Sequence, residues 1–192
     1  MKRLLIISIL LLSVGSSQNR VNVNNLVQYG DKYFKENDDK PFNGIVFDLS
    51  KETGNKILEY KMIEGLKNGL YQEWYSDGKL KRKGKYLNNT QVGDWTVWYY
   101  NGQMKFELTS KMKVTLFNYW YEGGQKRSEG HWEDGKKVGK WFSWHSNGQV
   151  ESEGFYIDDQ KDGLWVSYDE TGTKVSEEAY AAGALINNSS LE

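Results

Sequence analysis

A repeated pattern of glycine and aromatic residues constrains the fold of this 192-residue chain more than any other feature. The clearest copy runs from Gly139 to Gly148, with aromatic residues two and five positions after the first glycine. Glycines open four units, at Gly69, Gly93, Gly139 and Gly163, and Thr115 takes that position in a weaker unit. Successive starts lie 24, 22, 24 and 24 residues apart. A fixed period of this length indicates a repeat architecture.

Four further positions of the unit hold the same type of residue in nearly every copy. Counting the opening residue as zero, position two holds Tyr71, Trp95, Phe117, Trp141 and Trp165. Position five holds Trp74, Trp98, Trp120, Trp144 and Tyr168, and position nine holds Gly78, Gly102, Gly124, Gly148 and Gly172. Position seventeen holds Tyr86, Ser110, Trp132, Tyr156 and Tyr180. A degenerate unit opens at Gly44, which gives about six units between Gly44 and roughly Gly183.

Each unit is predicted to be a β-hairpin. Pairs such as Asp77-Gly78 and Asn147-Gly148 accept the positive φ angles that a tight type I′ turn needs. A second, looser turn is expected between units, at Asn88-Asn89, Asp134-Gly135 and Asp158-Asp159. A lone hairpin is marginal in water, so we expect each ring to pack against its counterpart in the next unit. The expected fold is an elongated, twisted, all-β array of about six tandem β-hairpin repeats of roughly 22–25 residues.

The sequence leaves one question about the aromatic rows open. Positions two and five have opposite parity, so their side chains point to opposite faces of a straight strand. Either both faces of the ribbon are covered or a bulge intervenes. The unit that opens at Gly93 is also irregular, because it is two residues short and carries Lys111-Met112-Lys113 in place of its linking turn.

The N-terminus is typical of a secretory signal peptide. Lys2 and Arg3 precede an apolar run from Leu4 to Leu12, which is about half the ~20 residues of a membrane-spanning helix. We expect a signal peptide at residues 1–17, cut before Gln18, with a retained membrane anchor as the alternative. The remaining boundaries are a lead-in and N-terminal cap at 18–43, the array at 44–183 and a C-terminal tail at 184–192. The chain is therefore expected to be exported, either periplasmic or secreted.

The cap region contains one recognisable local signal. Gly30-Asp31 is a dipeptide of the kind that hairpin turns use, so a strand pair is expected around it. End segments of repeat proteins commonly cover the open edge of the array. We expect this segment to do the same.

Composition and motifs exclude several kinds of function. The chain has no cysteine, which rules out disulfides, thiolate zinc sites, a cysteine nucleophile and a lipidated cysteine anchor. A net charge of -1 gives no indication of a nucleic-acid partner. The HExxH, GxSxG and Walker phosphate-loop motifs are absent, and the two histidines, His131 and His145, occupy ordinary repeat positions. No catalytic residue, metal ligand or cofactor is assigned, and the chain is not expected to be an enzyme.

The aromatic rows supply the candidate binding residues. A thin ribbon needs most of its rings for packing, so the position-five tryptophans are assigned mainly to the core, with a binding face as the alternative. Tyr75, Tyr99 and Tyr121 stand one position further on. We expect them to form an exposed row and to be the first candidates for partner contact.

Two charged rows are interpreted as solvated faces of the sheet. Glutamates recur at position fourteen as Glu107, Glu129, Glu153 and Glu177. An acid ladder for cations or for general acid–base work is the alternative for this row. The strand from Lys79 to Lys85 carries four lysines and Arg82, and contact with an acidic protein or anionic headgroups is its alternative.

The pattern Gly-x-Trp-x-x-Trp-x-x-x-Gly resembles the MORN-repeat variant of bacterial proteins often labelled toxin–antitoxin system antitoxins. Lys40-Pro41-Phe42-Asn43-Gly44 is similar to that family's entry into its first unit, and the resemblance covers about residues 40–183. The antitoxin label implies a protein partner. A resemblance to MORN proteins in general implies scaffolding, protein binding or association with membrane lipids.

We therefore expect a non-catalytic exported module that binds a protein partner, as a scaffold or in an antitoxin-like role. The alternative is a cell-envelope module that binds glycan or lipid headgroups through its aromatic rows. Neither hypothesis involves nucleic acid or a cofactor. The sequence does not specify an oligomeric state.

Overall fold

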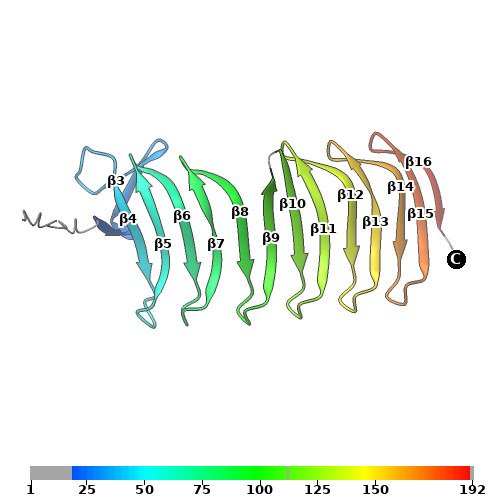
Figure 1. The fold of residues 1–192 in the computed structure, drawn as a ribbon, viewed down its shortest axis with the longest axis horizontal. Coiled ribbons are helices and arrows are strands. Elements are labelled where there is room, and N and C mark those ends of the chain that lie inside the picture. The colour runs from blue at the N-terminus through cyan, green and yellow to red at the C-terminus, as the bar shows by residue number, and fades with distance from the viewer. Residues whose placement is uncertain (1–18, 112, 191–192) are drawn as a thin grey trace, which may run out of the picture.

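The computed structural model describes residues 19–111 and 113–190, so the expected signal peptide lies outside the described residues. Its main feature is one open sheet of 14 strands in the order β1-β4 and then β5 to β16 in sequence. Figure 1 shows these strands standing side by side along the long axis of the molecule. The predicted all-β array of tandem hairpins is confirmed.

The long sheet is built from strands of three to nine residues. They are β1 Arg20–Asn22, β4 Gly44–Leu49, β5 Lys56–Ile63, β6 Leu66–Trp74, β7 Leu80–Leu87, β8 Thr90–Trp98, β9 Met104–Lys111, β10 Val114–Trp120, β11 Lys126–Glu133, β12 Lys136–Trp144, β13 Val150–Ile157, β14 Gln160–Tyr168, β15 Lys174–Ala181 and β16 Ala184–Ser190. A separate hairpin joins β2 Leu26–Tyr29 to β3 Lys32–Lys35, after the short 3₁₀ turn η1 at Val23–Asn25. Among the residues described, no helix has the length and apolar character needed to cross a bilayer.

The turn inside each unit differs from the prediction. Gly78 has a φ of 89°, whereas Asp77 has no positive φ. The Gly78 N–H donates to the Tyr75 carbonyl at 2.9 Å, and the Tyr75 N–H donates to the Lys79 carbonyl at 2.8 Å. This is a turn closed by a left-handed glycine, the arrangement of a three-residue hairpin with a G1 bulge. The prediction of type I′ turns at these positions was wrong.

The tight turns lie between the units instead. Asn88 and Asn89 have φ angles of 48° and 65°, and the residues on either side of them pair directly, Leu87 with Thr90. Two central residues with positive φ define the type I′ hairpin. Asp158 and Asp159, at 49° and 70°, repeat the arrangement. The tight type I′ turns therefore lie between the units and the longer turns lie inside them, which is the reverse of the prediction.

The opening glycine of each regular unit forms a bulge. On β12, Gly139 has a φ of 69°. It is the first of three residues that face the single residue Gly130 on β11, since Glu129 pairs with Phe142 and His131 pairs with Val138. The left-handed backbone explains the glycine, because other residues adopt it at a cost.

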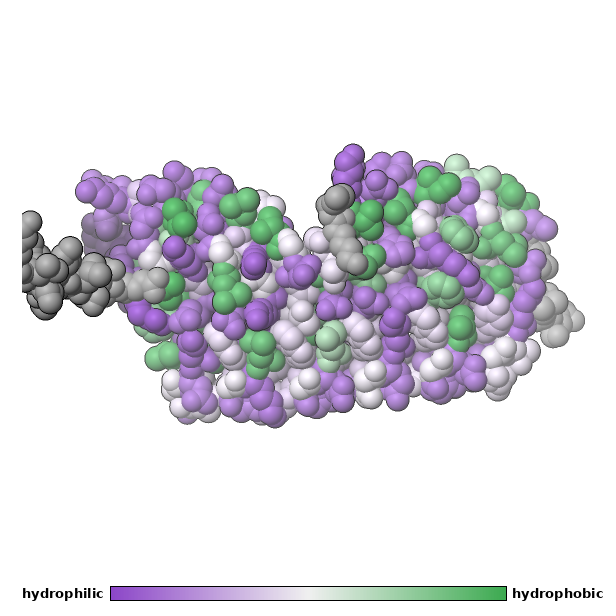
Figure 2. All heavy atoms as spheres, viewed as in Figure 1, coloured by the Kyte–Doolittle hydropathy of each residue, from purple (hydrophilic) through white to green (hydrophobic). Residues whose placement is uncertain are grey.

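This bulge is missing where β9, the second strand of the short third unit, pairs with β10 of the next unit. Strands β9 and β10 pair without a register shift from Lys111 and Val114 to Phe106 and Tyr119. The two missing residues are therefore the bulge, and Thr115 can replace the glycine because it needs no positive φ. The sheet continues unbroken through this unit. Figure 2 shows its upper rim hollowed there, between the β7–β8 turn and the strands that follow.

Both faces of the sheet carry aromatic residues. On β12, Trp141 and Phe142 are consecutive residues in regular pairing with β13, so they point to opposite faces. Trp144 stacks on Phe142 at 5.6 Å and therefore lies on the face opposite to Trp141. The register shift between Ser143 and Trp144 adds its extra residue to β13. The first of the two open alternatives is therefore correct. We call the face that carries the position-two residues, from Tyr71 to Trp165, the aromatic face. The face that carries the position-five residues, from Trp74 to Tyr168, is the second face.

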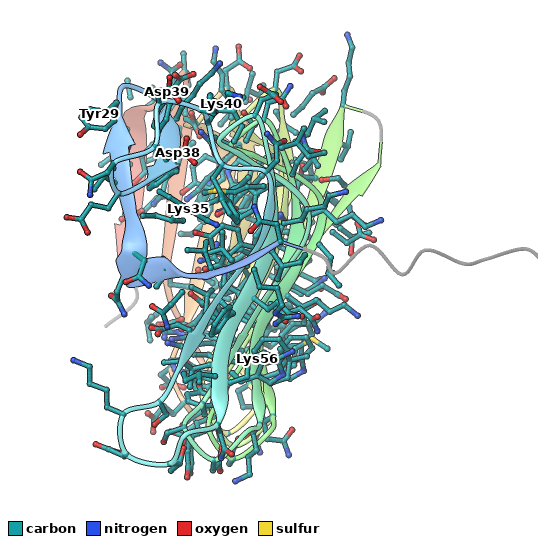
Figure 3. The ribbon with its side chains drawn as sticks, turned by 90° about the vertical axis from the view of Figure 1, so that its left-hand side faces the viewer. Tyr29, Lys35, Asp38, Asp39, Lys40 and Lys56 are labelled. Atoms are coloured by element: carbon teal, nitrogen blue, oxygen red, sulfur yellow. The ribbon has the colours of Figure 1, made fainter. Side chains whose placement is uncertain are left out.

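The N-terminal segment, residues 19–43, forms a cap in two ways. Strand β1 pairs in parallel with β4 and covers that edge of the sheet, as expected. The β2–β3 hairpin, with Gly30-Asp31 at its turn, packs on the aromatic face, where the Tyr33 N–H donates to the Gly65 carbonyl at 3.0 Å. In Figure 3, seen from this end of the sheet, the hairpin stands to one side of the strands, with Tyr29 and Lys35 on it.

At the other end, residues 184–190 form strand β16, which pairs with β15. They had been expected to be part of a C-terminal tail. The hairpin series thus extends one strand beyond the expected boundary at residue 183.

Candidate functional site

A column of aromatic rings crosses the C-terminal half of the aromatic face. Each ring comes from a different strand: Phe117 from β10, Trp132 from β11, Trp141 from β12, Tyr156 from β13 and Trp165 from β14. Neighbouring ring centroids are 4.9, 5.2, 5.8 and 5.0 Å apart along this order. All four pairs are edge-on, a favourable geometry for aromatic contacts. The column is therefore one continuous packed surface.

Glycines on the neighbouring strand make room for the indoles. A Cβ placed on Gly130 would lie 2.2 Å from Trp141 ring atoms, and one on Gly154 would lie 2.2 Å from the ring of Trp165. Gly84 has the same relation to Trp95, at 2.1 Å. Each large ring thus packs directly on the backbone of the preceding unit.

The cap covers the N-terminal half of the aromatic face, on the strands before this column. Val21 and Phe42 of the cap are buried with Tyr60, Tyr71 and Trp95 in one core cluster, against which Leu108 also packs. The tip of the cap hairpin reaches the β7–β8 turn, where the Asn89 side-chain amide donates to the Asp31 carbonyl at 2.7 Å. The chain's own N-terminal segment therefore covers the first units.

Beyond Leu108 the column lines an open groove. Two adjoining cavities of about 360 and 490 Å³ share Phe117 and Trp132 as lining residues. The larger begins at Leu108, and the smaller extends to Tyr156 and Trp165. We call the surface formed by Phe117, Trp132, Trp141, Tyr156 and Trp165 the aromatic groove.

A row of serines forms one side of the groove. Register pairs join Ser128, Ser143, Ser152, Ser167 and Ser176 across five neighbouring strands, and the first three line the smaller cavity. The same lateral row holds larger side chains in the N-terminal half, namely Leu58, Glu73, Arg82, Val97, Phe106 and Tyr119. The small serines leave the groove open and give it a hydroxyl-lined side. We call these five residues the serine row.

Lysines form the other side. Along β12, the residues Lys137, Trp141 and Ser143 follow one another on the aromatic face. The Lys137 ammonium lies 4.8 and 4.9 Å from the ring centroids of Trp141 and Tyr156. Lys161 repeats this on β14, at 4.6 Å from the centroid of Trp165. Such cation–π contacts hold the ammonium groups at the groove.

The tyrosines predicted to be the exposed row are half-buried. Their hydroxyls donate to backbone carbonyls of the next unit: Tyr75 to Trp98 at 2.8 Å, Tyr99 to Trp120 at 3.0 Å and Tyr121 to Trp144 at 2.9 Å. They therefore tie successive hairpins together, and the expectation that they are exposed was wrong. Their contact with a partner stays a prediction.

His145 continues this series. Its Nε2 lies 2.9 Å from the Tyr168 carbonyl, which is the same relation to the next unit. Burial and the hydrogen bond with Tyr119 raise the pKa of Tyr99 to about 12, so this hydroxyl keeps its proton at ordinary pH. A histidine at this repeat position thus contacts the backbone carbonyl of the next unit, as tyrosine does in the other units.

The position-five tryptophans lie half-buried on the second face. Phe142 stacks on Trp144 at 5.6 Å, and the Lys56 ammonium lies 4.6 Å from the ring centroid of Trp74. The buried rings are those of position two, such as Trp95, Trp141 and Trp165, which are at most 9% exposed. The position-five tryptophans, which are expected mainly in the core, are thus only half-buried, and the most buried row is position two.

The glutamate row also lies on the second face and is paired with lysines. Salt bridges join Lys126 to Glu129, Lys140 to Glu153 and Lys174 to Glu177. Within residues 19–111 and 113–190 no group of His, Asp and Glu side chains could hold a metal ion. This row has the geometry of a charged sheet surface and lacks that of an acid–base pair.

Sequence reasoning missed the serine row and the glycines under the indoles. Both have a signal in the repeat alignment, since Gly84, Gly130 and Gly154 share position fifteen and Ser143 and Ser167 share position four. The cap's position over the N-terminal half of the aromatic face has no such signal. It depends on contacts between distant parts of the chain.

Fold and site together define a β-hairpin repeat module with an open aromatic groove. Three segments, residues 67–88, 91–112 and 137–158, match the family model described as MORN repeat variant. They coincide with the hairpins β6–β7, β8–β9 and β12–β13. Three repeats of the MORN repeat variant are therefore detected in the chain, and its resemblance to that family is confirmed.

Other comparisons add little. No curated protein matches the chain. A solved structure of a protein of unknown function from Bacteroides fragilis covers 78% of this chain and 93% of its own length, at 10% identity and a TM-score of 0.14. A similarity this low has no bearing on fold or function.

Proposed function

We propose that this chain is an exported, non-catalytic module that binds a polypeptide segment of a partner protein in its aromatic groove. The observation that carries the proposal is the unequal covering of the aromatic face. Cap residues are buried with Tyr71 and Trp95 in one cluster, whereas the rings of Phe117, Trp132 and Tyr156 on the later strands are half-buried and line open cavities.

The cap supports polypeptide as the class of occupant. It covers the column with apolar side chains, such as Val21 and Phe42, and with backbone hydrogen bonds to turn residues. The part beyond the cap presents the half-buried rings of Phe117, Trp132 and Tyr156 to a partner, and aromatic residues are enriched among the residues that dominate binding at protein interfaces. Export is supported by Lys2, Arg3 and the apolar run that follows them.

A photo-crosslinking experiment in the native host tests the proposal. A benzophenone amino acid is placed at Tyr156, which lines the groove, or at its neighbour Phe155, which points to the second face and is 50% exposed. We expect a protein adduct from position 156 and none of the same mass from position 155. The adduct should disappear when Ser143→Trp fills the smaller cavity.

Three outcomes would count against the proposal. Equal adducts from both positions would mean that the groove is not the binding surface. An adduct that survives Ser143→Trp would have the same meaning. A glycan or lipid adduct at position 156 would favour the alternative class of ligand, and a thermal melt of Ser143→Trp shows whether the variant still folds.

A further inference from the structure

We propose that the aromatic groove selects an acidic polypeptide segment, whose carboxylates meet Lys137 and Lys161. The inference rests on the proposed function and names the chemistry of its partner. It follows from three features that run side by side across the strands: a lysine side, an aromatic floor and a serine side.

The lysine side of the groove carries positive charge that a ligand could contact. Lys137 is half-buried in the lining of the smaller cavity, with its ammonium over the rings of Trp141 and Tyr156. Within the described part of the chain it forms no salt bridge. Lys161 has one carboxylate nearby, that of Glu178, at 3.9 Å. An ammonium held against rings loses hydration on one side and gains from a carboxylate on the other.

Nearby lysines outside the groove are already paired. Lys136, next in the chain to Lys137, is 3.5 Å from the Asp158 carboxylate. On the second face Lys140 pairs with Glu153 at 2.8 Å. Of these three lysines of β12, Lys137 is the one without a salt bridge among the described residues, and it lies on the aromatic face, where a ligand in the groove would bind.

The serine side suits a polypeptide backbone. The hydroxyls of Ser143 and Ser152 lie 2.7 Å apart, and each hydroxyl offers both a donor and acceptor lone pairs. Backbone N–H and C=O groups need partners of both kinds when they leave water. An extended segment across β11 to β14 would place apolar side chains on the rings, its backbone near the serines and its carboxylates near the lysines.

Continuity with the cap interface supports this occupant. The groove adjoins the cluster in which the cap is buried, because Leu108 packs against that cluster and also lines the larger cavity. The lateral row changes from large side chains to serines between Tyr119 on β10 and Ser128 on β11, where the larger cavity gives way to the smaller one. The bare half therefore suits a segment that is more polar than the cap.

Three labelled peptides test the inference by fluorescence anisotropy with the purified chain. They alternate Phe with Glu, with Gln or with Lys, and each is measured at low and at high salt. We expect the Glu peptide to bind about tenfold more tightly than the Gln peptide at low salt, and the Lys peptide to bind most weakly. High salt should narrow these differences, because it screens exposed charges.

Lys137→Gln should remove most of the preference for Glu over Gln, whereas the matched control Lys136→Gln should keep it. Equal binding of the three peptides would overturn the inference, as would a preference that survives Lys137→Gln or tighter binding of an acidic polysaccharide. The crosslink at position 156 is independent of these measurements. If position 156 gives a protein adduct but the peptides show no preference for Glu, the acidic nature of the partner is refuted, while the proposal that the groove binds a protein still stands.

Discussion

The indole of Trp141 lies directly over the α-carbon of Gly130 on the preceding unit. A Cβ on that glycine would lie 2.2 Å from atoms of the ring, closer than side chains can approach. Gly130 has no positive φ, so its conformation is open to other residues. The contact between units, rather than the backbone angle, requires glycine at this position.

Gly130→Ala should therefore destabilise the array. Forcing a methyl group against a packed ring costs about 1–3 kcal/mol in unfolding free energy. The control is Gly123→Ala in the turn of the same hairpin, where a Cβ would meet only the end of the flexible Gln125 side chain. Urea unfolding of both variants measures the difference. Equal midpoints would show that the indole can move aside at little cost.

The type I′ turn at Ala182 predicts a stabilising change. Ala182 has a φ of 47°, where a side chain costs energy and glycine does not. We expect Ala182→Gly to raise the unfolding free energy by about 0.5–1 kcal/mol. Ala181→Gly, within strand β15, should lower it by a similar amount. Thermal unfolding that ranks the two variants the other way would contradict this assignment of the turn.

The hydroxyl series predicts a modest loss for Tyr121→Phe. The change removes the 2.9 Å hydrogen bond to the Trp144 carbonyl, for which about 0.5–1.5 kcal/mol is expected. Tyr29→Phe is the control, because that side chain is 67% exposed. If urea denaturation finds the two variants equally stable, water replaces the Tyr121 hydroxyl without loss.

The edge between the cap and the sheet should weaken in acid. Burial alone would raise the pKa of the Glu59 carboxyl, but hydrogen bonds from Arg20 of β1 and from Lys56 outweigh it and lower the pKa below the ordinary 4.5. A lowered pKa stabilises the fold above the ordinary value, and this stabilisation is lost as the pH falls through the lowered one.

Urea unfolding between neutral pH and pH 3 measures this contribution. The wild-type unfolding free energy should fall with pH more steeply than that of Glu59→Gln, and Glu151→Gln, at an exposed position, should behave like the wild type. If the unfolding free energies of the wild type and Glu59→Gln fall in parallel as the pH is lowered, Glu59 is not the cause of the loss of stability in acid.

Much of the fold can be predicted from the sequence because its contacts are local. Each strand from β5 to β15 pairs with its two neighbours in the chain, so the glycine and aromatic period determines the strand order. The prediction of the two turn types was wrong for a physical reason. Both kinds of turn need a residue with a left-handed backbone, and pairs such as Asp77-Gly78 and Asn88-Asn89 can supply that residue in either kind of turn.

The groove could not be predicted in the same way. Its limits are set by where the cap ends, and the Asn89 amide that holds the cap's tip is 58 residues from Asp31. The choice of the core row also depends on the position of the bulge. Gly139 places the bulge before Trp141, and only the register shows that Trp141 then meets Gly130.

The order of the strands has a mechanical consequence. They lie side by side along the long axis, so a pull between the two ends would load the hydrogen bonds of one edge strand at a time. The sheet would then peel hairpin by hairpin. A released unit of 24 residues extends to about 80 Å, against roughly 10 Å within the sheet. Under tension, the array would lengthen in steps while the groove on the remaining units stays intact.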